Sequence, residues 1–413
     1  MSISYPPAPS TAPLGLEGTD TPFAVDERLL ERVRSLEPII RQHADGSERE
    51  RRLAQSVFDA MRGEGLFRMF TPRALGGLEM DPVTVARIAE EVAGFDSAAG
   101  WALQAGNTGA WWASHLPEAG VAELFADGPD QLIAASFNPP HRAEEVQGGY
   151  RVSGRGPLAS TIHDSPWVMV IAIVFDGEQP RMTPFGPEIV TLTMRRSDVE
   201  IVDTWYSLGM RGTDSNDVAT NGVFVPASRS FPLSPEYERA AQFQGPLYRL
   251  PALVSTFVVI VPVALALARG AITELRELAG RKTPLGLRKT LRDRPTVQAA
   301  LAEGEALLRA ARLFFYDTLT TAWLRAVGGE PATLEQKADL MLAGTHAVQS
   351  AARVVEIMHR MAGTSGIYAR NRLERHFRDV QTVRQHGFLC ESRLETVGQV
   401  YFGMEPEFAL VAF

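Results

Sequence analysis

Hydrophobic residues in the first part of the chain recur at the spacing of an amphipathic helix. They stand three or four positions apart at Leu29, Leu30, Val33, Leu36 and Ile40. A second helical run covers residues 48–63, a third begins at Asp81-Pro82, and a fourth begins at Asp96-Ser97. An Asp before a helix and a Pro at its first position are typical of helix starts. We therefore expect an N-terminal helical domain over residues 23–130.

The pattern changes in the middle of the chain. Five short runs rich in β-branched residues stand at residues 131–136, 150–154, 167–174, 189–194 and 218–225. Gly, Pro, Asp and Asn separate them, and no helix-length pattern lies between. Because parallel neighbours usually need a crossover helix, these runs predict an antiparallel β-barrel or sandwich over residues 131–245.

Helical patterns return after residue 245 and continue to the end of the chain. Apolar stripes with a period of 3.6 residues cover 295–327, 331–362 and a last stretch from 378 to 402. These runs predict a C-terminal four-helix bundle over residues 246–413. The predicted fold class is therefore α+β, mainly α, with a central β-domain between two helical domains.

One segment of the predicted bundle, Leu250 to Ala268, has no charge and is long enough to span a bilayer. It contains Pro251 and Pro262 and has no aromatic anchors at its ends. A helix that is apolar on all sides is also what the centre of a large helical assembly requires. We interpret the segment as a buried core helix and expect no membrane association.

Composition and charge narrow the function classes. The net charge of −8 argues against a nucleic-acid partner, because phosphate binding needs a concentrated basic surface. The single Cys390 cannot form an internal disulfide, and no secretory signal opens the chain, so we expect a cytoplasmic protein. Residues 1–22, rich in Pro, Ser, Thr and Gly, are expected to be a disordered tail. The histidines have no tight ligand-like spacing, and we predict no metal site.

A dinucleotide-like pattern, Gly154-x-Gly156-x-x-Ala159, lies within the predicted β-domain. A strand follows it rather than a helix, so no helix N-terminus would face a pyrophosphate. We therefore expect that the protein does not bind NAD(P)H itself.

Three segments in a fixed order carry a resemblance to a known family. The first is residues 149–168, with a Gly-Tyr opening and then Ser160-Thr161 in a loop. The second is residues 205–215, which contain Gly-Met-Arg-Gly-Thr, and the third combines residues 363–368 with Arg378-Asp379. These segments resemble motifs of the acyl-CoA dehydrogenase fold superfamily, and the similarity covers nearly the whole chain.

In that superfamily a flavin lies between the β-domain and the C-terminal helices, and a neighbouring subunit completes the site. The resemblance therefore implies a homotetramer, or at least a dimer, and candidate cofactor-binding residues. Ser160 or Thr161 would hydrogen-bond flavin N5, and Trp205 would pack against the isoalloxazine. Asn138 would contact substrate or flavin. The flavin phosphate would be bound by Arg281 together with the turn of a neighbouring subunit formed by Gly363, Thr364 and Ser365.

The position of the catalytic base distinguishes two branches of the superfamily. Dehydrogenases place a carboxylate over the flavin, but this chain has His386 after Arg378-Asp379 and reaches Glu391 only later. The alternative position, early in the first C-terminal helix, holds Val, Ile, Pro and Ala. In these respects the chain resembles the flavin-dependent monooxygenases of this fold, such as p-hydroxyphenylacetate hydroxylases, dibenzothiophene monooxygenases and sugar nitrososynthases.

That branch implies a two-component monooxygenase. Reduced FMN, with FAD as a possible substitute, would arrive from a separate flavin reductase and react with O2 to give a C4a-hydroperoxyflavin. This species would oxygenate a small organic substrate, aromatic or a natural product. Ser160 would slow the loss of peroxide, and His386 would be the catalytic acid or base. The alternative is an acyl-CoA dehydrogenase or oxidase with a displaced base, and a third possibility is a flavin-free scaffold.

One departure from the branch concerns the activation of the substrate. Some of its members have one or two histidines on the second N-terminal helix, facing the site. Counted from Asp96, this chain has Gly106-Asn107-Thr108 there. The identity of the substrate therefore cannot be taken from any one member.

Overall fold

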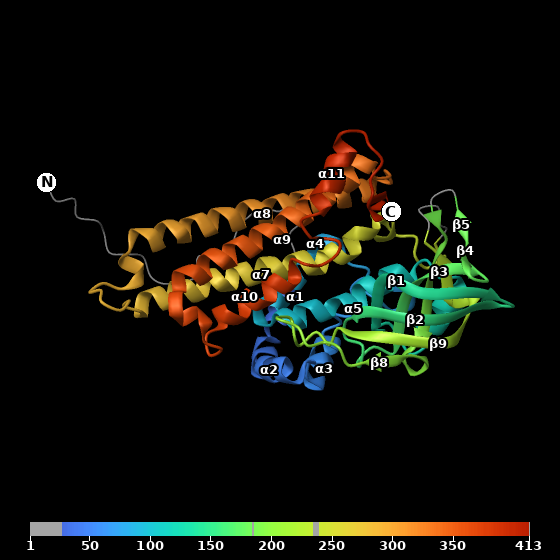
Figure 1. Ribbon diagram of the computed structural model, residues 1–413, viewed down its shortest axis with the longest axis horizontal. Coiled ribbons are helices and arrows are strands. Elements are labelled where there is room, and N and C mark those ends of the chain that lie inside the picture. The colour runs from blue at the N-terminus through green and yellow to red at the C-terminus, as the bar shows by residue number, and fades with distance from the viewer. Residues whose placement is uncertain (1–26, 184–185, 234–238, 413) are drawn as a thin grey trace.

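The computed structural model describes residues 27–183, 186–233 and 239–412. Helices occupy one end of an elongated molecule, and a twisted sheet occupies the other (Figure 1). The tail predicted at residues 1–22 lies outside the described residues.

The N-terminal region is helical, as predicted. Its helices are α1 (Glu27–Arg34), α2 (Glu37–Glu50), α3 (Gln55–Gly63), α4 (Pro82–Phe95), α5 (Ser97–Ala113) and α6 (Glu118–Leu124). The predicted starts of α4 and α5 are confirmed by their caps. Asp81 accepts a hydrogen bond from the N–H of Thr84, and Asp96 accepts two from the N–H groups of Ala98 and Ala99.

Two helices predicted in this region have different limits in the structure. The first is divided into α1 and α2, and Pro38 near the start of α2 lacks the N–H that a continuous helix would use. The second, expected over residues 48–63, is interrupted after Arg51, whose left-handed φ of 55° ends α2. Arg52 then pairs with Asp164, with 2.6 Å between nitrogen and oxygen. A contact distant in the sequence thus replaces a locally helical pattern.

The five predicted strand runs are confirmed as strands of one sheet. They are β1 (Ile133–Val146), β2 (Gly149–Ala159), β3 (Trp167–Asp176), β7 (Ile189–Arg195) and β9 (Asn216–Pro226). With the short strands β8 (Glu200–Val202) and β10 (Ser230–Pro232), they lie in the order β10-β7-β3-β1-β2-β9-β8, and β4 (Gln179–Pro180) pairs with β3. The short strands β5 (Met182–Thr183) and β6 (Gly186–Pro187) form a separate pair.

The prediction of an antiparallel sheet is wrong at its centre, and the described strands do not close into a barrel. β1 pairs in parallel with β3, with Ile133 opposite Trp167. β2 turns back antiparallel along one edge of β1, and residues 160–166 carry the chain to the other edge. The prediction assumed that successive strands are neighbours in the sheet. Here a short turn crosses over without a helix, so β2 and β3 flank β1 and the sheet is mixed.

The C-terminal region is a helical bundle around α7 (Ala252–Arg281). This helix packs against α4, α5, α8 (Pro295–Gly328), α9 (Leu334–Ala362) and α10 (Arg372–Val383), while α11 (Arg393–Tyr401) packs on α9. Of the described helices, α7 alone is long and apolar enough to cross a membrane, but 94% of its most apolar window is buried inside the protein. The interpretation as a core helix is confirmed. The stretch predicted as one helix over 378–402 is interrupted by a turn that contains His386.

Candidate active site

A cavity of about 430 Å³ lies where α5 and the start of α7 meet the sheet. Its walls come from α5, β1, the loop after β2, the loop between β8 and β9, and the turn that follows α10. Four residues predicted for the site line this one cavity although they are far apart in the sequence: Asn138, Ser160, Trp205 and His386. Thr161 and the residues predicted to bind phosphate do not line it.

One face of α5 forms a wall of the cavity. Its lining residues recur every three or four positions at Trp101, Gln104, Ala105, Thr108, Gly109 and Trp112. The sequence of α5 does not reveal this face, because the helix is apolar on nearly all sides and its periodicity does not mark which side is functional. Asn107 points elsewhere: its side chain bonds the N–H of Phe70 and the carbonyl oxygens of Leu66 and Leu103.

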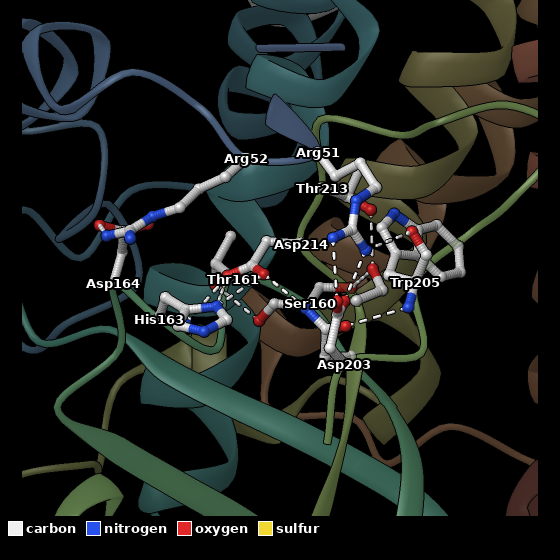
Figure 2. Close-up of polar contacts among 12 residues, drawn as sticks. Arg51, Arg52, Ser160, Thr161, His163, Asp164, Asp203, Trp205, Thr213 and Asp214 are labelled. Carbon is white, nitrogen blue, oxygen red and sulfur yellow. Dashed lines mark hydrogen bonds and ion pairs between the residues drawn. The ribbon is translucent and has the colours of Figure 1, made fainter. Parts of the chain in front are cut away.

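A chain of hydrogen bonds ends at the hydroxyl of Ser160. The Thr213 hydroxyl donates to the carbonyl oxygen of Met210 (2.9 Å), so it must accept from Ser215 (2.7 Å). Ser215 in turn accepts from Ser160 at 2.8 Å, and the indole N–H of Trp101 donates to Ser160 at 3.0 Å. The hydroxyl hydrogen of Ser160 is therefore used in the bond to Ser215, and the oxygen can still accept one more hydrogen bond from the cavity. Ser160 and Thr213 lie together in Figure 2.

Thr161 is not in the cavity wall. It is 1% exposed and has a left-handed φ of 57°. Its N–H donates to the carbonyl oxygen of Thr213 (2.8 Å), and its hydroxyl donates to the carbonyl oxygen of Ser160 (2.6 Å). Of the two hydroxyls predicted for this position, only that of Ser160 faces the cavity.

Trp205 is fixed in the wall of the cavity by hydrogen bonds within its own loop and to Asn216. Its backbone N–H donates to the side chain of Asn216 at 3.0 Å, and its indole N–H donates to the carbonyl oxygens of Met210 and Arg211. These bonds leave the indole as a flat apolar surface beside Ser160 (Figure 2).

Two adjacent arginines attach both loops of the cavity to the N-terminal helices. Arg52 binds Asp164, in the loop of Ser160, through two hydrogen bonds of 2.6 and 2.8 Å. Arg51 binds Asp203, beside Trp205, through two bonds of 2.6 and 3.1 Å. Both pairs are visible in Figure 2. The interruption between α2 and α3 thus places these side chains, because in a continuous helix their backbone would not turn toward the sheet.

His386 lies in the turn after α10 and is partly buried. Its Nδ1 accepts the N–H of Phe388 at 3.3 Å, which places the hydrogen of the neutral ring on Nε2. The ring lies edge-on to Trp101, with 5.8 Å between the ring centroids. Burial lowers the pKa of His386 to about 4, so the neutral form prevails at pH 7. The notion of an imidazole that titrates near working pH does not fit this environment.

No carboxylate lines the cavity among the described residues. Glu391, the nearest acidic residue after His386 in the sequence, is exposed outside it. No group of three or more potential metal-ligating side chains occurs in the described part of the chain. Among its described lining residues, the cavity therefore offers hydroxyls, amides and one imidazole, but no acidic base for proton abstraction at carbon.

Arg281 and the turn of Gly363, Thr364 and Ser365 lie together at the far end of the bundle. Lys282 beside Arg281 donates a hydrogen bond to the carbonyl oxygen of Ala362, directly before the turn. Arg281 stands 25 residues after the cavity-lining Thr256 on the same helix, about 38 Å at the helical rise per residue. In Figure 1, α7 runs from the sheet to the opposite end of the molecule. One chain thus does not bring this group to the cavity.

Asp379 of the predicted Arg-Asp pair connects the walls of the cavity. It is 3% exposed and accepts hydrogen bonds from the hydroxyl of Ser97 (2.7 Å) and the N–H of Met210 (2.6 Å). Arg375, which also pairs with Asp96 at 2.6 Å, lies 3.6 Å from it. Asp379 therefore holds α5, the Trp205 loop and α10 in one arrangement.

Comparisons with known proteins agree with this geometry. Residues 27–120 and 258–391 match the families described as acyl-CoA dehydrogenase N-terminal domain and C-terminal domain. Indole-3-acetate monooxygenase of Pseudomonas putida is 31% identical, over 87% of this chain and 90% of its own length. The oxygenase component of the FADH(2)-dependent resorcinol hydroxylase of a Rhizobium species is 27% identical, over 92% and 95%.

A solved structure has the same fold. XiaF from a Streptomyces species, in complex with FADH2 and glycerol, superposes with a TM-score of 0.85 at 25% identity and covers 92% of this chain and 96% of that one. The mixed sheet between two helical regions, the cavity with no carboxylate among its described lining residues, and these relatives lead to one assignment. The chain belongs to the acyl-CoA dehydrogenase fold family, and within it to the flavin-dependent monooxygenases.

Proposed function

We propose that the cavity is where reduced flavin, O2 and a small aromatic substrate meet, with the flavin delivered by a separate reductase. When bound, the reduced flavin supplies two electrons to O2, so that one oxygen atom enters the substrate and the other leaves as water. The observation that carries this proposal is the cavity itself, which has no carboxylate among its described lining residues. A dehydrogenase would need such a base above the ring.

Ser160 is the proposed contact to flavin N5. The nitrogen at this position carries a hydrogen in reduced flavin and acts as a donor. Ser160 has donated its own hydrogen to Ser215, and its oxygen remains an acceptor. An acceptor at this position holds the N5 hydrogen in place, and Trp205 covers the adjacent face and excludes water.

His386 is proposed to orient the substrate. Its Nε2–H is the donor in the neutral ring, because Nδ1 is occupied by Phe388. A substrate oxygen bound at Nε2 would be held within reach of the flavin that packs on Trp205. We propose hydrogen-bond donation as the role of His386 at neutral pH, because a pKa of about 4 makes the ring a weak base.

The phosphate end of the flavin is proposed to reach a second copy of the chain. A flavin whose ring lies at Ser160 cannot extend to Arg281 of the same chain, about 38 Å along α7 from the cavity. Arg281 and residues 363–365 are exposed or half-buried, and a second subunit could present them. We propose a homo-oligomer on this ground, and FMN or FAD as the flavin.

A binding and turnover experiment tests the function. Reduced FMN and reduced FAD are titrated into the protein under argon, and oxygen is then admitted with a panel of phenols and indoles. The expected result is tight binding of reduced flavin and oxygen consumption that yields hydroxylated product. Anaerobic bleaching of tightly bound oxidised FAD by an acyl-CoA, without any hydroxylated product, would instead establish dehydrogenation.

A further inference from the structure

The inner wall of the cavity carries polar groups without partners. Among the described residues, the side chains of Gln104 on α5 and Thr256 on α7 form no hydrogen bond, although Thr256 is only 2% exposed. Trp112 is 4% exposed, and its indole N–H has no acceptor. Buried polar groups are almost always hydrogen-bonded. Among these three, the Trp112 N–H is the buried group without a partner, while Gln104 is half-buried and Thr256 lines the cavity. Together they mark the polar positions of this wall that a ligand can use.

The three groups lie along the line where α5 and α7 are joined, with Gln104 and Trp112 about 12 Å apart on α5. The hydroxyl of Thr108 donates to the carbonyl oxygen of Ser255 at 2.6 Å, which fixes Thr108 beside Thr256. Gln104 is one turn before Thr108 on α5, and Trp112 is one turn after it. We call Gln104, Trp112 and Thr256 the seam cluster.

The remainder of this end of the cavity is aromatic and apolar. Phe137, Met169 and Phe388 line it, and Phe137 lies 5.2 Å from Trp112 between ring centroids. No Lys or Arg lines the cavity in the described part of the chain. A carboxylate placed here would be removed from water without a counter-ion, which is strongly unfavourable.

We propose that the seam cluster selects an uncharged, planar aromatic substrate with one hydroxyl or ring N–H, and rejects aromatic carboxylates. This inference rests on the proposed function for the position of the flavin, at Ser160 and Trp205. The aromatic ring lies between Phe137, Phe388 and Trp112, while Gln104 and Thr256 hydrogen-bond its polar substituent. Gln104 supplies both a donor and an acceptor, so it serves a hydroxyl as well as an N–H.

The test compares two ligands of nearly the same shape. Indole-3-ethanol is neutral and indole-3-acetate is an anion, and their binding is measured by calorimetry under argon with the protein saturated with reduced FMN. We expect indole-3-ethanol to bind at least about tenfold more tightly. Equal or tighter binding of indole-3-acetate would overturn the proposal.

Variants of Gln104 make the test specific to the seam cluster. Gln104→Leu, which keeps the length but removes the amide, should weaken indole-3-ethanol binding by about fivefold or more. Gln104→Arg should reverse the preference toward indole-3-acetate. Unchanged affinities in both variants, with melting temperatures near that of the wild type, would also overturn the proposal.

Turnover distinguishes this inference from the proposed function. If the anion is oxygenated efficiently with reduced flavin, the substrate class is wrong but the monooxygenase function stands. If the neutral ligand binds preferentially but no phenol or indole is oxygenated with either reduced flavin, the proposed function fails while the binding preference stands.

Discussion

Replacing Asp379 by Ala would remove the carboxylate that joins three walls of the cavity. Two hydrogen bonds would be lost, from Ser97 and from the N–H of Met210, and that N–H would remain buried without an acceptor. Arg375 would keep Asp96 at 2.6 Å and Glu48 at 3.5 Å, so it would not become an unpaired charge.

The expected cost follows from these contacts. Breaking a buried, hydrogen-bonded ion pair costs about 3–5 kcal/mol, and the remaining partners of Arg375 favour the lower end. At about 2.1 cal/mol/K per residue, the 413 residues have an unfolding entropy of about 0.9 kcal/mol/K. A loss of ~3 kcal/mol in the free energy of unfolding therefore lowers the melting temperature by about 3–4 °C. Asp379→Asn keeps an acceptor for Met210 and should lose about half as much.

The assay is thermal unfolding followed by circular dichroism, together with the yield of product per O2 consumed. We expect the yield to fall in Asp379→Ala because the Trp205 loop loses its anchor. The matched control is Asp198→Ala, at an exposed position of the β-domain, which should stay within about 1 °C of the wild type. A melting temperature and yield for Asp379→Ala equal to those of the control would refute this account of the three walls.

Three further predictions concern the site and its surroundings. Ser160→Ala should lower the product yield per O2 several-fold. The melting temperature should fall by only about 2–3 °C, because the two hydrogen bonds of this hydroxyl, to Ser215 and from Trp101, are worth about 1 kcal/mol each. An unchanged ratio of product formed to O2 consumed would exclude the N5 contact. Gly209→Ala should destabilise the loop of Trp205, because a Cβ at position 209 would lie 2.2 Å from the carbonyl oxygen of Arg378. Flavin affinity, measured by fluorescence titration, should therefore fall. An affinity equal to that of the wild type would show that the loop can shift at little cost. Burial lowers the pKa of His141 and His386 to about 4 and that of His115 and His376 to about 3. Below pH 6.5 the unfolded chain therefore binds more protons than the folded protein, and the urea concentration at the unfolding midpoint should fall steadily as the pH is lowered from 6.5 toward 4. A midpoint that does not change with pH would contradict these burial effects.

Local patterns identified most elements of the fold, and the pairing of the strands depended on distant contacts. The caps at Asp81 and Asp96 are short-range signals, and both helix starts were predicted from them. The parallel pairing of β1 with β3 has no local signal, because the turn of residues 160–166 decides which edge of β1 the chain reaches. The interruption of the helical pattern after Arg51 is likewise caused by partners more than one hundred residues away.

Site residues that belong to a sequence motif could be predicted, whereas those in uniformly apolar helices could not. The resemblance placed Ser160, Trp205, Asn138 and His386 at one site, and they line one cavity. Gln104 and Thr256 escaped notice because both stand in helices whose remaining faces are almost entirely apolar. Side-chain periodicity reports burial, and in a helix buried on all sides it cannot separate the face toward a cavity from the face toward the core.

The backbone around Ser160 explains why its surroundings could be identified only as a motif. Four residues without the freedom of glycine have left-handed φ angles there: Leu158 at 65°, Thr161 at 57°, Met210 at 53° and Asp214 at 52°. Such conformations cost about 1 kcal/mol or more each and persist only where the surroundings enforce them. Asp214 is held by the N–H and ring of His163 at 2.9 and 2.8 Å, and Met210 by Asp379. Local preference and native conformation therefore disagree at the positions around Ser160, and such disagreements cluster at functional sites.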